Sequence, residues 1–386
     1  MRFAVLGAGA MGSRAAQTLA ALPGVDDLVV ADLDRARAES VAAALPAATA
    51  RRVDVADGVA LRGFLADVDV VLSTVGPYYR FGADVLRAAV DTGTDYMDIC
   101  DDWEPTAEFL ELDGAARAAG ICAVIGAGAS PGLSTLLAAA AAARLDRVRD
   151  LYTAWPVDAA GAAGTGGGTM PGAAGVHWMH QCSGTVVELA AGAPVRRAPL
   201  RAVRLTLPGG RRGTAYTVGH PEPITLRRTV APSGESACLM LLRPGTAAYL
   251  DVLRREIDGG RLTPDGAAEL LEPPSWSRVL RSLPGAWTRR GAGTLPPFFA
   301  AADGTVGGRD LRVCARLETD GALLQDMAAV TGVPAALAAA QLPAVRRPGV
   351  HPPDALLDGP RLFADLAVAF PGTRMIVDEE AGWLRE

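Results

Sequence analysis

Glycines close to the N-terminus have the spacing of a turn that binds a dinucleotide. The stretch Gly7-Ala8-Gly9-Ala10-Met11-Gly12 follows an apolar run directly and precedes an Ala- and Leu-rich segment. In such a turn the first glycine permits the tight bend, the second lets the backbone approach a pyrophosphate, and the third lets the next helix pack closely on the sheet. The free N–H groups at the start of that helix would stabilise the phosphates. We therefore expect Gly7, Gly9, Ala10, Met11 and Gly12 to bind the cofactor.

An acidic residue stands where such a turn needs one. Asp32 ends the second apolar run, residues 28–31, and follows Gly12 by twenty positions. A carboxylate there would accept hydrogen bonds from the adenosine ribose and would repel a 2′-phosphate. This favours NAD as the cofactor. Arg35 and Arg37 follow closely and could bind a phosphate, so NADP stays open.

A loop further along the chain could place the nicotinamide and move a proton. Residues 69–73 form a continuous apolar run that leads into Ser73-Thr74-Val75-Gly76-Pro77-Tyr78. By fold analogy this loop lies beside the nicotinamide ribose, so we expect Ser73, Thr74, Gly76 and Pro77 to line the cofactor. The Tyr78 hydroxyl is the best proton-handling candidate there. The same sequence would also fit an aromatic ring packed at a domain hinge.

Three carboxylates follow the next predicted strand. Asp98, Asp101 and Asp102 could hold a substrate ammonium, and their mutual repulsion would raise one pKa enough for proton transfer. Asp98 closes the strand and is expected to be the inward, catalytic member. The alternative is a set of solvated loop acids that cap the helix near Pro105.

Histidines and arginines in the second half of the chain supply further candidates. His177 and His180 are three residues apart on one predicted helix, but no acidic companion completes a metal site, so no metal is predicted. His180 is the third catalytic candidate, and the stretch Gly219-His220-Pro221-Glu222 is another. Paired arginines could clamp substrate carboxylates, although surface solvation is the expected role of each pair: Arg196-Arg197, Arg211-Arg212 and Arg227-Arg228.

The elements that must position these residues alternate between strand and helix. Apolar, strand-like runs alternate with helical patterns as far as residue 125, which predicts a doubly wound parallel sheet of Rossmann type. The six predicted strands are residues 2–6, 28–31, 52–55, 69–73, 95–99 and 121–125. Ligands of such sheets lie outside the carboxyl ends of the strands. The stretch from Gly126 to Gly132 would open a helix with Ser130 as N-cap and Pro131 at the first position, or form a tight turn between domains, or both.

The pattern changes near Arg147. Predicted strands at residues 148–155, 185–189, 202–207 and 213–218, with a hairpin signal at Pro208-Gly209-Gly210, indicate a second, α+β domain on a mostly antiparallel sheet. A Gly/Ala-rich loop is expected at residues 161–168. The predicted domains are residues 1–130, residues 131–348, and a C-terminal segment of residues 349–386.

Composition excludes several classes of protein. The 386 residues suffice for two domains, and none of them is lysine, so Schiff-base, P-loop and Tyr-x-x-x-Lys mechanisms cannot operate. The longest apolar run, residues 133–143, is too short to span a membrane, and no secretory leader is recognisable. Five scattered cysteines fit a reducing cytoplasm. A net charge of -6 and a pI of about 5.4 argue against nucleic-acid binding.

Several motifs together resemble the family of saccharopine dehydrogenase (saccharopine reductase) and lysine 6-dehydrogenase. They are the glycine turn, Ser73-Thr74-Val75-Gly76-Pro77-Tyr78, Tyr96-Met97-Asp98-Ile99-Cys100-Asp101 and Gly128-Ala129-Ser130-Pro131-Gly132-Leu133. The resemblance implies a nicotinamide cofactor on the first domain, a mixed α/β second domain, and a C-terminal segment that returns to the first. Saccharopine reductases have an Asp-Pro-Gly stretch near the substrate where this chain has Ser130-Pro131-Gly132, which puts saccharopine itself in doubt.

The sequence therefore predicts a cytoplasmic NAD(P)-dependent oxidoreductase that acts on the C–N bond of an amino acid or its imine. Two alternatives stay open: a non-redox enzyme of cyclodeaminase type that uses tightly bound NAD, and a catalytically inactive dinucleotide sensor. The expected partner is a small amino-acid-like substrate, with no nucleic acid and no membrane. A homodimer formed through the sheet of the second domain is expected by analogy with the family.

Overall fold

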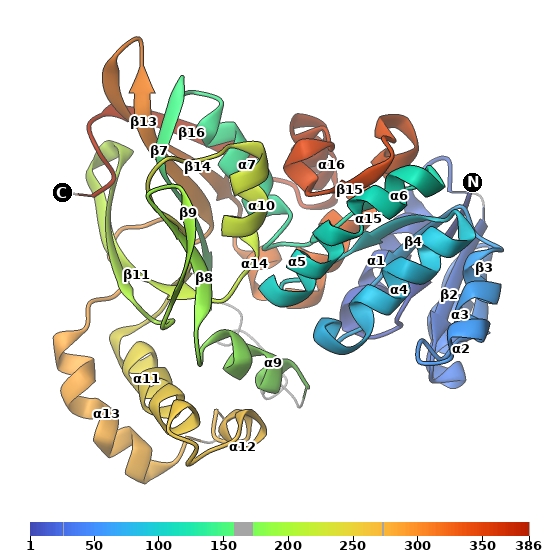
Figure 1. Ribbon diagram of the computed structural model, residues 1–386, viewed down its shortest axis with the longest axis horizontal. Coiled ribbons are helices and arrows are strands. Elements are labelled where there is room, and N and C mark those ends of the chain that lie inside the picture. Colours follow the sequence, from blue (N-terminus) through green and yellow to red (C-terminus); the bar gives the residue numbers. More distant parts are fainter. Residues whose placement is uncertain (26, 158–172, 272–273, 386) are drawn as a thin grey trace. The chain divides into compact units, whose positions relative to one another are not determined.

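The computed structural model describes residues 1–25, 27–157, 173–271 and 274–385 (Figure 1). The chain forms two compact units. The first contains residues 1–136 and 326–374, and the second contains residues 137–325 and 375–386. The Gly/Ala-rich loop predicted at residues 161–168 lies outside the described residues.

The first unit is built on a parallel sheet of seven strands within the described residues, in the order β3-β2-β1-β4-β5-β6-β15. The central strands β1 and β4 are buried and apolar except for the partly buried Arg2 and the buried Ser73, as a sheet covered on both faces requires. The strands are β1 Arg2–Leu6, β2 Asp27–Asp32, β3 Ala48–Arg52, β4 Val70–Ser73, β5 Asp95–Asp98, β6 Cys122–Val124 and β15 Gly349–His351. The predicted doubly wound sheet is confirmed.

Helices of the first unit pack in two groups of neighbours. Helices α3, α4 and α5 contact one another in sequence, and α15 contacts both α1 and α16 (Figure 1). The bounds are α1 Ala10–Ala21, α2 Arg35–Ala43, α3 Gly58–Leu65, α4 Tyr78–Thr92, α5 Trp103–Glu111, α6 Asp113–Ala119, α15 Met327–Val345 and α16 Gly359–Ala369. Asp34 and Asp57 cap α2 and α3 by accepting backbone N–H groups, which sets where those helices begin.

Helix α15 is the most apolar helix of the first unit. Among the described residues it is the one helix whose length and hydropathy would allow it to cross a membrane, yet 72% of that apolar window is buried inside the molecule. A helix that is apolar on all sides is typical of a core position. Gly332 makes its close approach to α1 possible, because a Cβ there would lie 2.5 Å from the Met11 carbonyl oxygen.

The second unit is built on a mixed sheet with the strand order β10-β11-β12-β7-β13-β14-β16, and β8 pairs with β12 and β9 beside this path. Most pairs are antiparallel, while β12 and β7 are parallel. The strands are β7 Arg147–Pro156, β8 Val186–Ala190, β9 Ala193–Arg197, β10 Ala202–Leu207, β11 Arg211–Val218, β12 Ser236–Leu241, β13 Phe299–Val306, β14 Arg309–Glu318 and β16 Arg374–Ala381. The predicted hairpin at Pro208-Gly209-Gly210 joins β10 to β11.

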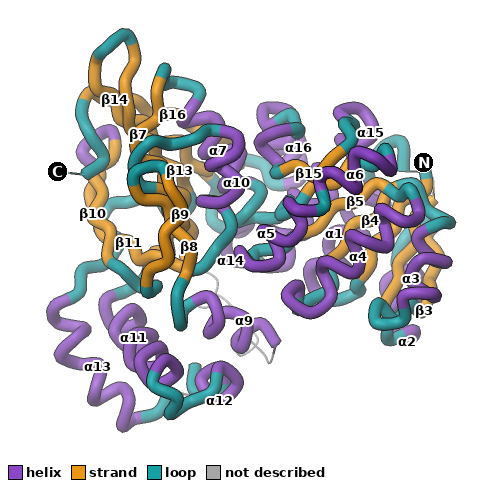
Figure 2. Tube along the Cα trace, in the orientation of Figure 1, coloured by secondary structure: helices purple, strands orange, loops and turns teal. Residues whose placement is uncertain are grey.

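Helices of the second unit gather mainly at one end of it. Helices α9, α11, α12 and α13 contact one another in pairs there (Figure 2). The bounds are α7 Leu133–Ala142, α9 Ala173–Gln181, α10 Glu222–Thr229, α11 Pro244–Asp258, α12 Pro264–Ala268, α13 Trp276–Thr288 and α14 Ala322–Gln325. Helix α7 begins in the first unit and ends in the second.

The division into units differs from the predicted segments 1–130, 131–348 and 349–386 in two places. Helix α15 packs on α1 and belongs to the first unit, although it was expected in the second domain. Conversely, the predicted C-terminal segment is divided. Its α16 belongs to the first unit, whereas residues 375–386 belong to the second, where β16 adds to the sheet.

Candidate functional site

The glycine turn lies where the strand order of the first sheet reverses. Strand β1 is flanked by β2 on one side and β4 on the other, which is the switch point at which open α/β sheets bind ligands. Gly7 has a φ of +102°, and its N–H donates to the Ala31 carbonyl at 2.7 Å. A Cβ on Gly7 would lie 2.7 Å from Thr74 Oγ1. Glycine at this position therefore allows both the bend and the contact with β4.

Gly9 and Gly12 have opposite surroundings. A Cβ on Gly12 would lie 1.9 Å from the Gly7 carbonyl oxygen, so the close packing of α1 on the turn requires glycine. No atom of the described chain, apart from near neighbours in sequence, lies within 4 Å of the position a Gly9 Cβ would take. Gly9 caps the N-terminus of α1, and both it and Ala10 are exposed, while Met11 is partly exposed. A pyrophosphate fits this open helix terminus.

Asp32 is fixed against the same turn. Its Oδ2 accepts the Ala8 N–H at 2.7 Å, and its Oδ1 accepts the Asp34 N–H at 2.8 Å. Each carboxylate oxygen has two acceptor sites, so the partly exposed group keeps capacity for ribose hydroxyls. Arg35 forms an ion pair with Glu39 at 2.7 Å, which holds its guanidinium on its own helix.

The loop after β4 closes onto the turn. Thr74 N–H donates to the Leu6 carbonyl at 2.8 Å, and Thr74 Oγ1 donates to the Gly7 carbonyl at 3.0 Å. Ser73 is buried, whereas Gly76 is exposed and Pro77, which is partly exposed, caps the start of α4. Thr74, Gly76 and Pro77 are accessible and Ser73 is not, and the predicted role of these residues in lining the cofactor stays a prediction.

Tyr78 is built into the framework of the loops. The ring is buried, its hydroxyl donates to the Ser73 carbonyl at 3.0 Å, and it accepts the Ile99 N–H at 3.4 Å. Burial, together with the nearby Asp98 carboxyl group, raises the pKa of Tyr78 well above its usual value. Its hydroxyl therefore links the loops that follow β4 and β5, both of which lie within the first unit, and its proton-handling role stays a prediction.

Asp98 has a similar linking position. The side chain is fully buried and accepts the Tyr96 hydroxyl at 2.9 Å, the Cys100 N–H at 2.9 Å and the Gly126 N–H at 2.7 Å. Burial raises the pKa of Asp98 to about 6, although these hydrogen bonds oppose the shift. The carboxyl group joins the ends of β5 and β6, and Asp102 precedes α5 as its N-cap residue.

The stretch after β6 departs from the prediction. Helix α7 begins at Leu133, so Ser130 and Pro131 belong to the preceding loop and not to a helix start. Gly132 has a φ of +124°, and a Cβ there would lie 2.0 Å from the Gly128 carbonyl oxygen. The loop is therefore a tight turn, although it lies within the first unit and not between domains, and the close approach to Gly128 explains the glycine at position 132.

In the second unit the two histidines of α9 have different surroundings. His180 is exposed, and partial desolvation lowers its pKa. His177 Nε2 lies 2.9 Å from the Gln181 side-chain nitrogen. His180 thus meets the accessibility that a proton-transfer residue needs, and its catalytic role stays a prediction.

His220 and Glu222 form a buried polar cluster with Cys238. The sequence had indicated His220 and Glu222 but not Cys238. His220 Nδ1 lies 3.5 Å from Glu222 Oε2, and the Cys238 thiol of β12 lies 3.7 Å from Glu222 Oε1. The Trp155 and His220 rings lie 5.3 Å apart between centroids. Burial lowers the pKa of His220, but Cys238 and Glu222 outweigh it and raise the pKa well above its usual value. Cys238 comes from a strand without a sequence signal of its own.

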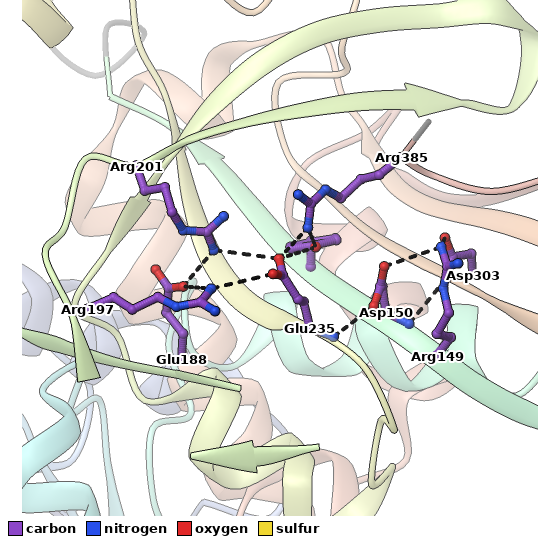
Figure 3. A network of polar contacts seen from close by, with 9 residues as sticks. Arg149, Asp150, Glu188, Arg197, Arg201, Glu235, Asp303 and Arg385 are labelled. Atoms are coloured by element: carbon purple, nitrogen blue, oxygen red, sulfur yellow. Dashed lines mark hydrogen bonds and ion pairs between the residues drawn. The ribbon is translucent and has the colours of Figure 1, made fainter. Parts of the chain in front are cut away.

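Two of the paired arginines, for which surface solvation was expected and carboxylate binding was the alternative, form ion pairs within the second unit. Glu188 accepts Arg197 at 3.4 Å and Arg201 at 2.6 Å (Figure 3). Glu235 accepts Arg197 at 3.4 Å and is also paired with Arg385. In another pair, Arg211 forms an ion pair with Asp378 at 3.3 Å. Arg197 and Arg211 therefore stabilise the second unit.

Comparisons with known proteins agree with this geometry. Residues 3–124 match the family model described as the saccharopine dehydrogenase NADP binding domain. The match confirms the resemblance expected from the sequence and NAD(P) as the cofactor class. The fold is similar to that of apo histidine-tagged saccharopine dehydrogenase (L-Glu forming) from Saccharomyces cerevisiae, with a TM-score of 0.68, 16% identity, and coverage of 98% of this chain and 100% of the other.

Other solved structures are less similar. An NAD binding oxidoreductase from Klebsiella pneumoniae has a TM-score of 0.39 at 16% identity, covering 84% of this chain and 73% of its own. A putative myo-inositol dehydrogenase from Sinorhizobium meliloti 1021 has a TM-score of 0.36 at 15% identity, covering 62% and 68%. These scores are too low to indicate a common overall fold.

Proposed function

We propose that this chain, whose first unit carries a saccharopine dehydrogenase-type NADP binding domain, is an NAD(P)-dependent oxidoreductase that acts on the C–N bond of an amino acid or its imine. The observation that carries the proposal is the accessible N-terminus of α1 at the switch point. The space around Gly9 is open there, and the Asp32 carboxylate is held beside the glycine turn by the Ala8 N–H. Family resemblance supports the C–N substrate class.

Different residues of the first unit would bind different parts of the cofactor. Gly9, Ala10 and Met11 would present backbone N–H groups to the pyrophosphate, and Asp32 would accept ribose hydroxyls. Thr74, Gly76 and Pro77 would line the nicotinamide end. A bound nicotinamide supplies hydride transfer to or from the substrate carbon.

We propose that a side chain of the second unit transfers the proton. Tyr78 and Asp98 are buried and hold loops together through hydrogen bonds within the first unit. His180 is exposed, and its lowered pKa favours the neutral ring that accepts a proton from an amine at physiological pH. We propose His180 as the proton carrier. A reducing cytoplasm as the site of action is supported by five buried cysteines, which form no disulfide bonds in the described structure.

Binding and turnover of the cofactor test the proposal directly. Calorimetry should show binding of NADH or NADPH, and a panel of amino acids and diamines, assayed in both directions, should change the nicotinamide absorbance. Absence of binding with both cofactors would contradict the proposal. Product formation without net change of the cofactor would point to the non-redox alternative.

Substitution of His180 tests the assignment of the proton. His180→Gln should lower kcat by roughly 100-fold or more while leaving cofactor affinity unchanged. The matched control is His177→Gln, which alters the neighbouring histidine of the same helix. Binding without turnover on any substrate, with His180→Gln indistinguishable from the natural chain in partner assays, would favour the sensor alternative.

A further inference from the structure

Helix α13 carries an exposed apolar stripe that nothing in the proposed oxidoreductase function explains. Trp276, Leu280, Leu283 and Trp287 are 82%, 63%, 44% and 88% exposed. At about 100° per residue, these four side chains fall within roughly 60° of the helix circumference. They therefore form one continuous row along the whole helix, which we term the α13 stripe.

The opposite side of α13 is the one that packs on its own unit. Ser282 is buried, Arg278 forms an ion pair with Glu256 of α11 at 2.8 Å, and a Cβ on Gly285 would lie 3.3 Å from Ala248 Cβ of α11. Viewed down the helix axis, these positions lie on the side of α13 roughly opposite the α13 stripe. The stripe thus faces away from α11 and is not part of the core of the unit.

Exposed apolar side chains elsewhere are isolated. The other large apolar residues exposed in the described chain each stand alone on their element, for example Val59 on α3 and Val368 on α16. Single exposed apolar residues are normal, whereas a contiguous patch marks an interaction site. Tryptophan is the residue type most enriched among the energetic centres of protein interfaces.

The order of residue types in the α13 stripe indicates its partner. Read from either end, the stripe is Trp-Leu-Leu-Trp with steps of four, three and four residues. A twofold axis through the middle of the helix would bring Trp276 onto Trp287 of a second copy, and Leu280 onto Leu283 of that copy. A dimer with twofold symmetry requires a self-complementary surface of this kind.

Charge and area agree with a protein partner of this kind. Arg278 and Arg281 of α13 are both paired with Glu256, so they do not form the free cationic face of a helix that lies on a membrane. The two tryptophans alone present roughly 300 to 400 Å² per copy. With the two leucines, a pair of copies approaches the lower limit of about 1,200 Å² for specific interfaces.

We propose that the α13 stripe is the contact surface of a homodimer in which two α13 helices pack antiparallel around a twofold axis. This surface differs from the sheet-mediated dimer that family analogy suggested. It involves no residue of the proposed cofactor site, so the failure of either proposal leaves the other standing.

Solution mass and charge-reversed variants test the proposal. Sedimentation velocity from about 1 to about 100 μM should give twice the chain mass of 39.7 kDa. A variant with Leu280→Glu and Leu283→Glu should dissociate at least about 100-fold more readily, because two central apolar contacts become repulsive. The variant with Leu280→Arg and Leu283→Arg should also be monomeric, and mixing the two variants should restore dimers. Val368→Glu, at an apolar position on the first unit that is more exposed than either leucine, is the control and should stay dimeric.

Cross-linking checks the antiparallel arrangement without relying on charges. Copies with Trp276→Cys and copies with Trp287→Cys, mixed with oxidised glutathione as the electron acceptor, should form disulfide-linked dimers. Each variant alone should form far fewer. A natural chain that is monomeric at all these concentrations, a dimer that persists in the Glu variant, or a mixture that gives no cross-link would overturn the proposal. Equally, a monomer that sediments with phosphatidylglycerol vesicles through the stripe would assign it to a membrane.

Discussion

Gly9 and Gly12 are separated by less than one helical turn, yet replacement by alanine should affect them in different ways. At Gly9 a Cβ enters open space, so Gly9→Ala should leave the thermal midpoint of the cofactor-free protein unchanged and weaken NAD(P)H binding by about tenfold or more. At Gly12 a Cβ meets the Gly7 carbonyl, so Gly12→Ala should lower the stability of the fold by about 2 kcal/mol or more. Differential scanning calorimetry with and without cofactor separates the two effects. Equal loss of stability in both variants would contradict the assigned roles.

The buried carboxyl of Asp98 should make stability depend on pH. The native pKa is about 6, above the usual value of about 3.9 for an unfolded chain. Between those values the native state retains a proton that the unfolded state has lost, so the free energy of unfolding should fall as pH rises through this window. The raised pKa corresponds to a loss of about 3 kcal/mol in the free energy of unfolding across this window. Urea unfolding at a series of pH values should show a shallower decline in Asp98→Asn than in the natural chain, with exposed Asp84→Asn as control. An identical slope in Asp98→Asn would show that the carboxyl does not titrate in this range.

At the residue scale, the local geometry of the glycine turn could be predicted from the sequence, whereas the hydrogen-bond partners of the buried side chains could not. Gly7, Gly9 and Gly12 act through local geometry, which spacing within one turn specifies. Asp98 and Tyr78 act through partners that come from other loops, since Gly126 is 28 positions from Asp98. A single sequence does not show which distant N–H group will meet a carboxylate. Their proposed role as proton carriers stays a prediction, while the structure shows that both link neighbouring loops.

At the scale of elements, the packing of α15 on α1 should support the start of α1. Gly332→Ala would place a Cβ 2.5 Å from the Met11 carbonyl and 3.1 Å from the Ala15 nitrogen. Because the start of α1 forms the proposed pyrophosphate site, this variant should lose both stability and NAD(P)H affinity. Gly114→Ala in α6 is the matched control, since its Cβ meets no atom of the described chain within 4 Å. The control should be neutral or more stable by up to about 1 kcal/mol. A Gly332→Ala variant with unchanged cofactor affinity would separate α15 from the site.

Predicted elements were accurate where the periodicity was strong and incomplete elsewhere. The six parallel strands of the first sheet were found, although β3 is Ala48–Arg52 and not residues 52–55. Strands β12 and β13 were not predicted, because their buried residues show no alternation of polar and apolar types. Helix α15 was expected in the second domain, because a helix that is apolar on almost all sides has no polar face to indicate which unit it packs on.

At the scale of the whole molecule, the last residues complete the second unit. Leu384 is fully buried, its N–H donates to Asp303 Oδ2 at 2.8 Å, and Trp383 lies under the Arg149 guanidinium at 3.8 Å. Arg385 pairs with Glu235 (Figure 3). Removal of residues 383–386 should therefore lower the stability of the second unit by about 2 to 4 kcal/mol. Hydrogen exchange should accelerate in β7 and β13 and stay unchanged in β1 and β4. Uniform acceleration in both sheets would contradict this prediction.

The ion pair between Arg385 and Glu235 should make the stability of the second unit depend on pH. Burial raises the pKa of Glu235, but Arg385 and Arg201 outweigh it and lower the pKa below its usual value. The ion pair therefore contributes stability above the unfolded-state pKa of about 4.3, and this contribution is lost as pH falls through the native pKa. Arg385→Ala should cost measurable stability at pH 7 and little at about pH 3. An equal cost at both values would indicate that packing of the arginine stem, and not its charge, stabilises the tail.

The chain passes from the first unit to the second, returns through residues 326–374, and ends in the second. During synthesis on the ribosome, the first unit cannot receive β15 and α15 until some 190 further residues have been translated. The second unit in turn waits for β16 and the final residues. Neither sheet is finished until residues 349–351 and 374–381 have been translated, so the nascent protein must hold two unfinished edges in solution at once. Unpaired strand edges of this kind are prone to aggregation, which chaperones counteract.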